Sequence, residues 1–234
     1  MTLEGHLSKS KHPDEPSSAA ETGGSGTRTL LFGAPALVAL LIASAPMLGR
    51  FLNSLFAILA ISTIYWIVCW GLALKAVPLG RLRSMYEVPI NRRPLELLLT
   101  WVPVVATFSI VFLHAAPHLP ARILAAIALV ALVNGVTEEL FWRGGFVVAS
   151  PGDIRLAYFY PTILFAAWHF ALALVPGVVY HGGVPALVGG AAAMGLGWGW
   201  VVWKTRDIRS VTVAHVLTNT FAFSGLVLDT WVGV

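Results

Sequence analysis

Long apolar runs dominate the chain and alternate with short polar stretches. Most runs have about 20 residues, the length that a helix needs to cross a hydrocarbon core of about 30 Å. The pattern predicts membrane-spanning helices at Leu30–Leu48, Leu52–Leu74, Leu95–Ala115, Ile123–Ala149, Tyr158–Tyr180, Pro185–Trp203 and Val211–Val234. We therefore expect an all-α fold, a polytopic transmembrane helical bundle with about seven to eight spans.

The first 28 residues have a different character from the rest of the chain. They are rich in Ser, Gly, Pro and charge and contain almost no large apolar side chain. Such a segment buries too little apolar surface to offset the entropy cost of becoming ordered. We expect a disordered cytoplasmic tail at residues 1–28 and a transmembrane domain at residues 29–234.

Charge supports the membrane assignment and predicts an orientation. Charged residues make up 11% of the chain, against about 25% in soluble domains. One predicted side of the membrane holds Lys9, Lys11, Arg28, Lys75, Arg81, Arg83, Arg92, Arg93, Arg155, Lys204, Arg206 and Arg209, and the other holds only Arg50 and Arg122. The positive-inside rule then predicts an integral protein of the cell (inner) membrane with a cytoplasmic N-terminus. Because the basic residues lie in these connections, we expect no nucleic-acid partner.

Only one cysteine is present, Cys69, and it lies within an apolar run. An intramolecular disulfide and a cysteine-based zinc site are therefore excluded. We expect Cys69 to be a small buried residue. In a later run, Gly195 and Gly199 form a GxxxG pair, which predicts close helix packing within the chain more strongly than a dimer contact.

Three charged residues interrupt the fourth apolar run, in the stretch GVTEELFWRGG at residues 135–145. One charge at the centre of a membrane helix costs about 2.5–3.5 kcal/mol on insertion scales, so this stretch requires an explanation. Glu139 and Arg143 are four residues apart and so predict an ion pair on one face. Glu138 points about 100° away, on the face of Asn134 and Trp142, and is left for a partner on another helix. The alternative is a buried packing network without function.

Two further spans carry a histidine and a residue one turn away from it. Phe165 and His169 form one such pair, and His215 and Asn219 form the other. A single interior histidine is more often structural than catalytic. Together with Glu138, however, these residues give three helices a polar face in the bilayer, where lipid offers no hydrogen-bond partner. We expect them to meet in the cytoplasmic half of the membrane.

Such a set of side chains has two possible chemistries. A carboxylate and an imidazole that share a water molecule activate it as a general base, while a second imidazole and a carboxamide stabilise an oxyanion. Alternatively, two histidines and a glutamate are the ligands of a catalytic zinc with one open position. Both routes lead to hydrolysis of a peptide bond.

The ordered motifs EExxxR, FxxxH and HxxxN on separate helices resemble the CPBP family, also called the Abi family. This family comprises CAAX prenyl endopeptidases and bacteriocin-processing enzymes. The resemblance covers a protease core at about residues 120–225 and rests on Glu138, Glu139, Arg143, Gly144, Phe165, His169, His215 and Asn219.

The resemblance implies an intramembrane endopeptidase with a membrane-embedded or lipidated substrate, such as a prenylated peptide, a leader or a sorting tail. It implies that Glu138, assisted by His169, activates water and that His215 and Asn219 line the oxyanion site.

The resemblance also assigns Glu139, Arg143 and Phe165 to structural support of the site. We favour a metal-independent glutamate protease, since Asn219 is a poor metal ligand and a good oxyanion donor. If Zn²⁺ is bound, Glu138, His169 and His215 are its expected ligands, as in a metalloendopeptidase. A proton-coupled transporter and a catalytically idle scaffold or immunity protein are the alternative functions.

Overall fold

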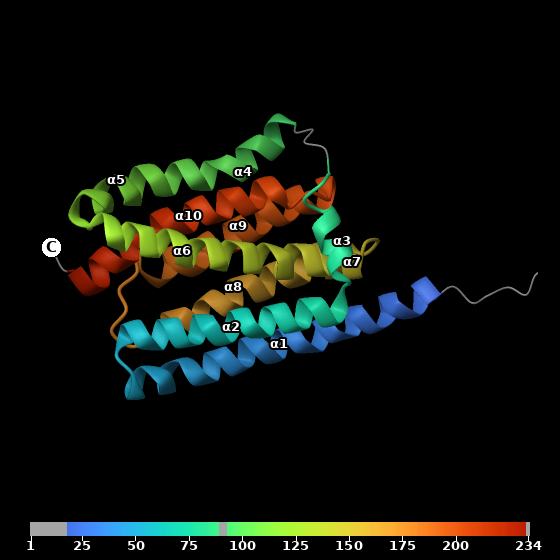
Figure 1. Cartoon of the computed structure of the whole chain (residues 1–234), viewed down its shortest axis with the longest axis horizontal. Helices are drawn as coiled ribbons and strands as arrows, with labels where there is room; N and C mark the ends of the chain where they lie inside the picture. Colours follow the sequence, from blue (N-terminus) through green and yellow to red (C-terminus); the bar gives the residue numbers. More distant parts are fainter. Residues whose placement is uncertain (1–17, 89–92, 233–234) are drawn as a thin grey trace, which may run out of the picture.

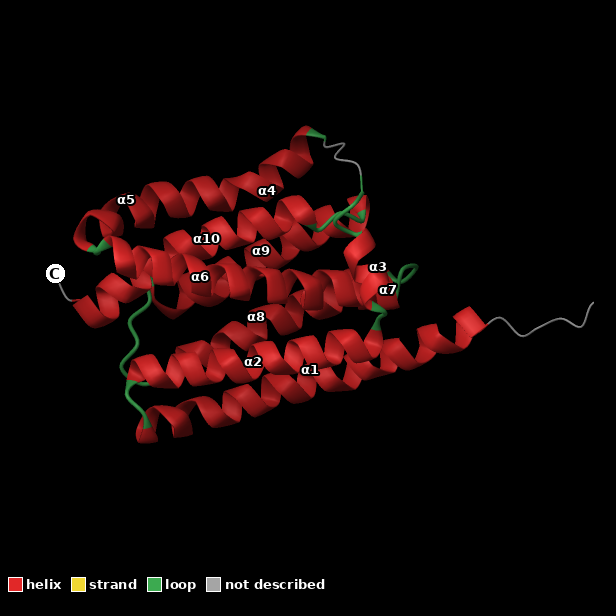
Figure 2. Ribbon diagram, viewed as in Figure 1, coloured by secondary structure: helices red, strands yellow, loops and turns green. Residues whose placement is uncertain are grey.

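The computed structural model describes residues 18–88 and 93–232 of the chain. Within these residues all regular structure is helical and there is no strand (Figure 2). Seven helical segments are long and apolar enough to cross a membrane: Gly24–Phe51, Ser54–Ala76, Pro94–His118, Ala121–Ala149, Arg155–Ala173, Gly183–Thr205 and Arg209–Val232. The predicted all-α membrane bundle is confirmed.

The described part of the chain contains ten α-helices, all of which except α3 lie in or overlap these seven segments, and several segments include a π-helical turn. The helices are α1 (Ser18–Phe51), α2 (Ser54–Ala76), α3 (Leu79–Ser84), α4 (Pro94–Thr107), α5 (Leu113–Ala115), α6 (Ala121–Glu138), α7 (Phe146–Ala149), α8 (Tyr160–Ala173), α9 (Gly183–Thr205) and α10 (Arg209–Val227). The π-helical stretch Glu139–Gly145 joins α6 to α7 without a break.

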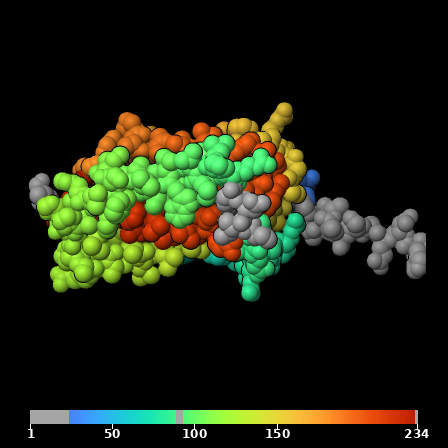
Figure 3. Space-filling model, turned by 90° about the horizontal axis from the view of Figure 1, so that it is seen from above, coloured from blue at the N-terminus to red at the C-terminus, as the bar shows by residue number. Residues whose placement is uncertain are grey.

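The helices form a bundle in which α6, α8, α9 and α10 lie between two flanking groups (Figure 1). The α1–α2 pair covers one side and α4 with α5 covers the other. The closest neighbours in the centre are α6 with α10 and α8 with α9. Seen from above, the red surface of α10 is visible between the green of α4 and the yellow-green of α6 (Figure 3).

A glycine allows α6 and α10 to approach closely. A Cβ atom on Gly135 would lie 2.8 Å from Val216 Cγ2 and 3.1 Å from the Val216 backbone nitrogen. Any larger residue at this position would therefore meet the backbone of α10. The contact brings Glu138, at the end of α6, and the following Glu139 next to the first half of α10.

The GxxxG pair packs within the chain, as predicted. A Cβ atom would meet the Thr162 side chain at 3.1 Å from Gly195 and the Tyr158 ring at 3.0 Å from Gly199. The small residues of α9 thus serve its contact with the segment that contains α8. Cys69 is buried inside the bundle, which is also as predicted.

Two boundaries differ from the expectation. The fifth span was predicted to reach Tyr180, which is wrong, because α8 ends at Ala173. Pro176 follows three residues later, and a proline disfavours helical geometry in the residue before it. Of the predicted tail, residues 1–17 lie outside the described residues, and α1 already begins at Ser18.

Candidate active site

The charged motif lies where α6 passes into the π-helical stretch. Glu138 is the last residue of α6, and all seven residues from Glu139 to Gly145 are buried. Short π-helical insertions inside α-helices occur frequently at functional sites. The only charged side chains of this span's second half are thus enclosed by protein rather than exposed to lipid.

Glu138 is fully buried, and each of its two carboxylate oxygens has two hydrogen-bond donors. Oε1 accepts from the Tyr65 hydroxyl at 2.8 Å and from Trp168 Nε1 at 2.7 Å. Oε2 accepts from Asn134 Nδ2 at 2.8 Å and lies 3.1 Å from His215 Nε2. A carboxylate has about four lone-pair sites, so this set of donors saturates it. The donors come from α2, α6, α8 and α10.

His215 bridges the two adjacent glutamates. Its Nε2 faces Glu138, and its Nδ1 lies 2.7 Å from Glu139 Oε1. An ionised carboxylate only accepts hydrogen bonds, so an imidazole between two carboxylates donates from both nitrogens and carries a positive charge. The two glutamates, Arg143 and this imidazolium then sum to zero charge, which is how a buried ionic cluster avoids an unpaired charge.

The ion pair expected from the spacing of Glu139 and Arg143 is present, with Arg143 Nη1 3.1 Å from Glu139 Oε1. The guanidinium also lies over the Phe165 ring, with Cζ 4.1 Å from the ring centroid. Glu139 is not neutralised by Arg143 alone, however, since the same oxygen also contacts His215. The two glutamates point in different directions, and one imidazole contacts both because its nitrogens lie on opposite sides of the ring.

His169 lies beside this cluster rather than within it. Its Nδ1 donates to the Phe165 carbonyl at 2.8 Å, and its ring packs edge-on against Phe165 and Trp168. A carbonyl only accepts, so in the neutral ring Nε2 is the nitrogen with a free lone pair. The structure records no direct hydrogen bond between His169 and Glu138 among the described residues.

Asn219 is buried one turn after His215 on α10, and its Nδ2 has no hydrogen-bond partner among the described residues. Buried polar groups in proteins are nearly always paired, so an unpaired amide donor requires an explanation. The neighbouring Thr218 hydroxyl is unpaired in the same way. Asn219 thus offers a donor for a bound molecule.

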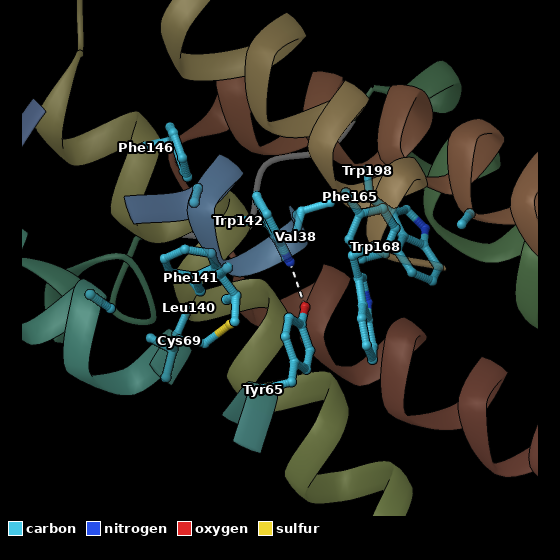
Figure 4. Packing of buried hydrophobic residues seen from close by; sticks show 14 of the residues in the cluster. Val38, Tyr65, Cys69, Leu140, Phe141, Trp142, Phe146, Phe165, Trp168 and Trp198 are labelled. Atoms are coloured by element: carbon cyan, nitrogen blue, oxygen red, sulfur yellow. Dashed lines mark hydrogen bonds between the residues drawn. The ribbon is translucent and has the colours of Figure 1, made fainter. Parts of the chain in front are cut away.

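Aromatic residues make up much of the site, and of its tryptophans and tyrosine the sequence analysis named only Trp142. Trp142 Nε1 donates to the Tyr65 hydroxyl at 2.6 Å, and the Tyr65 and Trp168 rings stack with centroids 3.8 Å apart (Figure 4). Trp66 Nε1 donates to Asn134 Oδ1 at 2.7 Å. A buried indole or phenol requires a partner for its polar atom, and this requirement is the sequence signal that would have pointed to them.

The arrangement does not fit the expected zinc ligands. No group of three or more His, Cys, Asp or Glu side chains in the part of the chain that the structure describes could hold a metal ion. Both nitrogens of His215 face carboxylates, and His169 Nδ1 is bonded to a carbonyl. We therefore derive no step through a metal.

Residues 120–221 match a family model described as "Type II CAAX prenyl endopeptidase Rce1-like". The match runs from the start of α6 into α10 and contains the two glutamates, both histidines and Asn219, whereas α1 to α5 lie outside it. No curated protein and no solved structure matches the chain. The match agrees with the resemblance carried by the three motifs. Residues 120–221 are therefore an Rce1-like domain of the type II CAAX prenyl endopeptidase (CPBP/Abi) family.

Proposed function

We propose that the chain is an intramembrane endopeptidase that hydrolyses a peptide bond in a membrane-associated, prenylated peptide. The observation that carries this proposal is the buried cluster of Glu138, His215 and Glu139 inside the family domain. A buried ionic cluster costs free energy in a membrane helix, which supports a role for it in chemistry. The prenylated substrate comes from the description of the family.

In the proposed reaction Glu138 is the general base, assisted by Nε2 of His169. Glu138 is saturated with donors, so a water molecule that binds it displaces one of these hydrogen bonds. The water oxygen attacks the carbonyl carbon while one proton passes to the carboxylate. When the tetrahedral intermediate collapses, the C–N bond breaks and the proton passes to the leaving amine.

We assign the oxyanion to the Asn219 amide, whose Nδ2 has no partner among the described residues. The sequence analysis assigned His215 to the same task. In the arrangement described above, both of its ring nitrogens contact carboxylates, so it has no N–H left for an oxyanion. We propose instead that His215 holds the two glutamates together, and that Arg143 and Phe165 support Glu139.

We place the site in the cytoplasmic half of the membrane. His215 is six residues after the start of α10 at Arg209, or about 9 Å along the helix at about 1.5 Å per residue. That end of the bundle also carries α3 and α7 (Figure 1). It bears most of the basic residues that predict a cytoplasmic location. The proposal moves the start of the transmembrane domain from residue 29 to the first candidate span, Gly24–Phe51, and places the N-terminal end of that span at the cytoplasmic side.

The test is cleavage of a farnesylated, internally quenched peptide by the purified protein in liposomes, with Glu138→Gln as the variant. Glutamine keeps the size of the side chain but does not take a proton from water. We expect loss of the measurable cleavage rate, at least about 100-fold, because general base catalysis contributes about 10²–10⁴-fold.

The control for this test is the melting temperature of the variant in detergent, which shows whether the bundle still folds. A folded Glu138→Gln protein that cleaves as fast as the wild type would reject Glu138 as the base. If the wild type cleaves no peptide but carries protons across the liposome membrane, the transporter alternative replaces the proposal.

A further inference from the structure

Helix α2 lies outside the family domain but contacts its central carboxylate. Two adjacent residues of α2 contribute, Tyr65 directly and Trp66 through Asn134. Their effects reach different oxygens, since Tyr65 donates to Oε1 and Asn134 donates to Oε2 of Glu138. The α1–α5 part of the chain is therefore more than a membrane anchor for the domain.

The direction of the Tyr65 hydrogen bond is determined by a tryptophan. An indole N–H is only a donor, so Trp142, 2.6 Å from the Tyr65 oxygen, makes that oxygen an acceptor. A phenol has a single hydrogen, and its remaining partner is Glu138 at 2.8 Å. The hydroxyl hydrogen of Tyr65 is thus directed to the Glu138 carboxylate.

The orientation of Asn134 is determined in the same way. Trp66 Nε1 lies 2.7 Å from Asn134 Oδ1 and makes it an acceptor. The amide nitrogen of Asn134 must then point to the other side, where it lies 2.8 Å from Glu138 Oε2. In both cases a tryptophan N–H binds the oxygen of a group that could otherwise rotate or flip. The hydroxyl of Tyr65 and the amide of Asn134 therefore donate their hydrogens to Glu138.

We propose that Tyr65 and Trp66 are positioning residues, through which α2 holds the Glu138 carboxylate in one orientation for the reaction. This inference rests on the proposed function. A base that is aligned before the substrate arrives lowers the barrier, because no reorientation is needed during the reaction. The stack of Tyr65 on Trp168, itself a donor to Oε1, holds the phenol in place.

Substitutions that keep the ring and remove one polar atom test this role. Tyr65→Phe keeps the stack on Trp168, and Trp66→Phe keeps an aromatic ring on α2. We expect each to lower kcat about 10- to 100-fold with KM within about twofold, since small misplacements of a reacting group have effects of this size. A purely structural role would lower the melting temperature without this selective effect on kcat.

The chain offers a matched control for each variant. Tyr160→Phe also removes a hydroxyl that joins two helices, at 2.7 Å from the Leu31 carbonyl, away from the carboxylate. Trp70→Phe removes an indole N–H that joins α2 to α6 at Thr137, 3.0 Å away, without contact to Glu138. We expect both controls to keep kcat within about twofold of the wild type, because they leave the reacting groups in place.

An infrared measurement separates this inference from the proposed function, because it requires no activity. The carboxylate band missing from Glu138→Gln belongs to Glu138, and we expect it to shift in Tyr65→Phe but not in Tyr160→Phe.

An unchanged band, or kcat values in Tyr65→Phe and Trp66→Phe equal to those of their controls, would overturn the positioning role even if Glu138 is the base. If Tyr65→Phe does not fold, the comparison of kcat between Trp66→Phe and Trp70→Phe decides whether α2 positions the carboxylate. If wild type and Glu138→Gln cleave alike, the proposed function fails, but the shift of the band still shows whether Tyr65 donates to Glu138.

Discussion

At the scale of single residues, the site is a neutral group of four charged side chains without access to solvent. Glu138, Glu139, Arg143 and His215 are all at most 3% exposed. Each charge has an opposite charge within 3.1 Å. The spacing of Glu139 and Arg143 predicted one of these contacts, because it depends only on helix geometry. The contacts of His215 with both glutamates were not predictable, because they depend on how α10 is placed against α6.

Removal of the Arg143 charge tests this balance. Arg143→Gln leaves an uncompensated carboxylate in the bundle, and we expect a loss of about 3–5 kcal/mol in the free energy of unfolding. The measurement is the melting temperature in detergent micelles. The matched control is Arg83→Gln, because Arg83 and Glu87 form an i,i+4 pair that is 81% and 64% exposed, against 3% and 0% for Arg143 and Glu139. Exposed pairs contribute little, so an equal effect of both variants would contradict the charge balance.

At the scale of elements, the contact between α6 and α10 brings the glutamates and His215 together. The hydrophobic pattern predicted the spans that contain these helices, Ala121–Ala149 and Arg209–Val232, with ends within a few residues of those observed. Their contact depends on Gly135, where α10 approaches to van der Waals distance. Apolar patterning gives no sign of this, since every face of a membrane helix is apolar and does not distinguish a neighbouring helix from lipid.

Gly135→Ala tests the contact. The new Cβ meets the Val216 backbone, so α10 has to move away from α6 and His215 moves away from Glu138. We expect a destabilisation of about 1–3 kcal/mol together with a lower kcat for peptide cleavage. The control is Gly189→Ala on α9, where a Cβ has no atom within 4 Å. There alanine is the better helix former, so stability should stay the same or rise. Full activity and stability of Gly135→Ala would contradict the role of this contact.

At the scale of the whole molecule, the bundle has two different ends. The loops beside α3 and α7 lie at one end, and the turn between α5 and α6 lies at the other (Figure 1). The excess of Lys and Arg at the first end predicts that it faces the cytoplasm. The proposed substrate site would then be reached from the cytoplasmic side of the bilayer.

Single-cysteine labelling checks this orientation. Cys69→Ala removes the only native cysteine, and Ser84→Cys or Ala121→Cys then introduces one exposed thiol at either end of the bundle. In intact cells, a membrane-impermeant maleimide should modify Ala121→Cys, whereas Ser84→Cys should react only after permeabilisation. The reverse pattern would place the N-terminus and the proposed site on the outer side.

The sequence by itself determined the class of the protein, the seven spans, the three motifs and the Glu139–Arg143 pair. These features depend on local quantities: the length of apolar runs, the cost of a charge in lipid and the spacing of residues on one helix. The same quantities correctly selected Asn134 as a neighbour of Glu138, one turn away.

Only the tertiary structure decided how the site is completed. Tyr65 and Glu138 are far apart in sequence and meet through a hydrogen bond between α2 and α6. Their partners Trp142 and Trp168 are aromatic residues in apolar runs, where pattern alone assigns them to lipid or to the core. A hydrogen bond between helices depends on the rotation and depth of both, and these are determined by packing across the whole bundle. For this reason the saturated carboxylate, the bridging His215 and the contribution of α2 appear only in three dimensions.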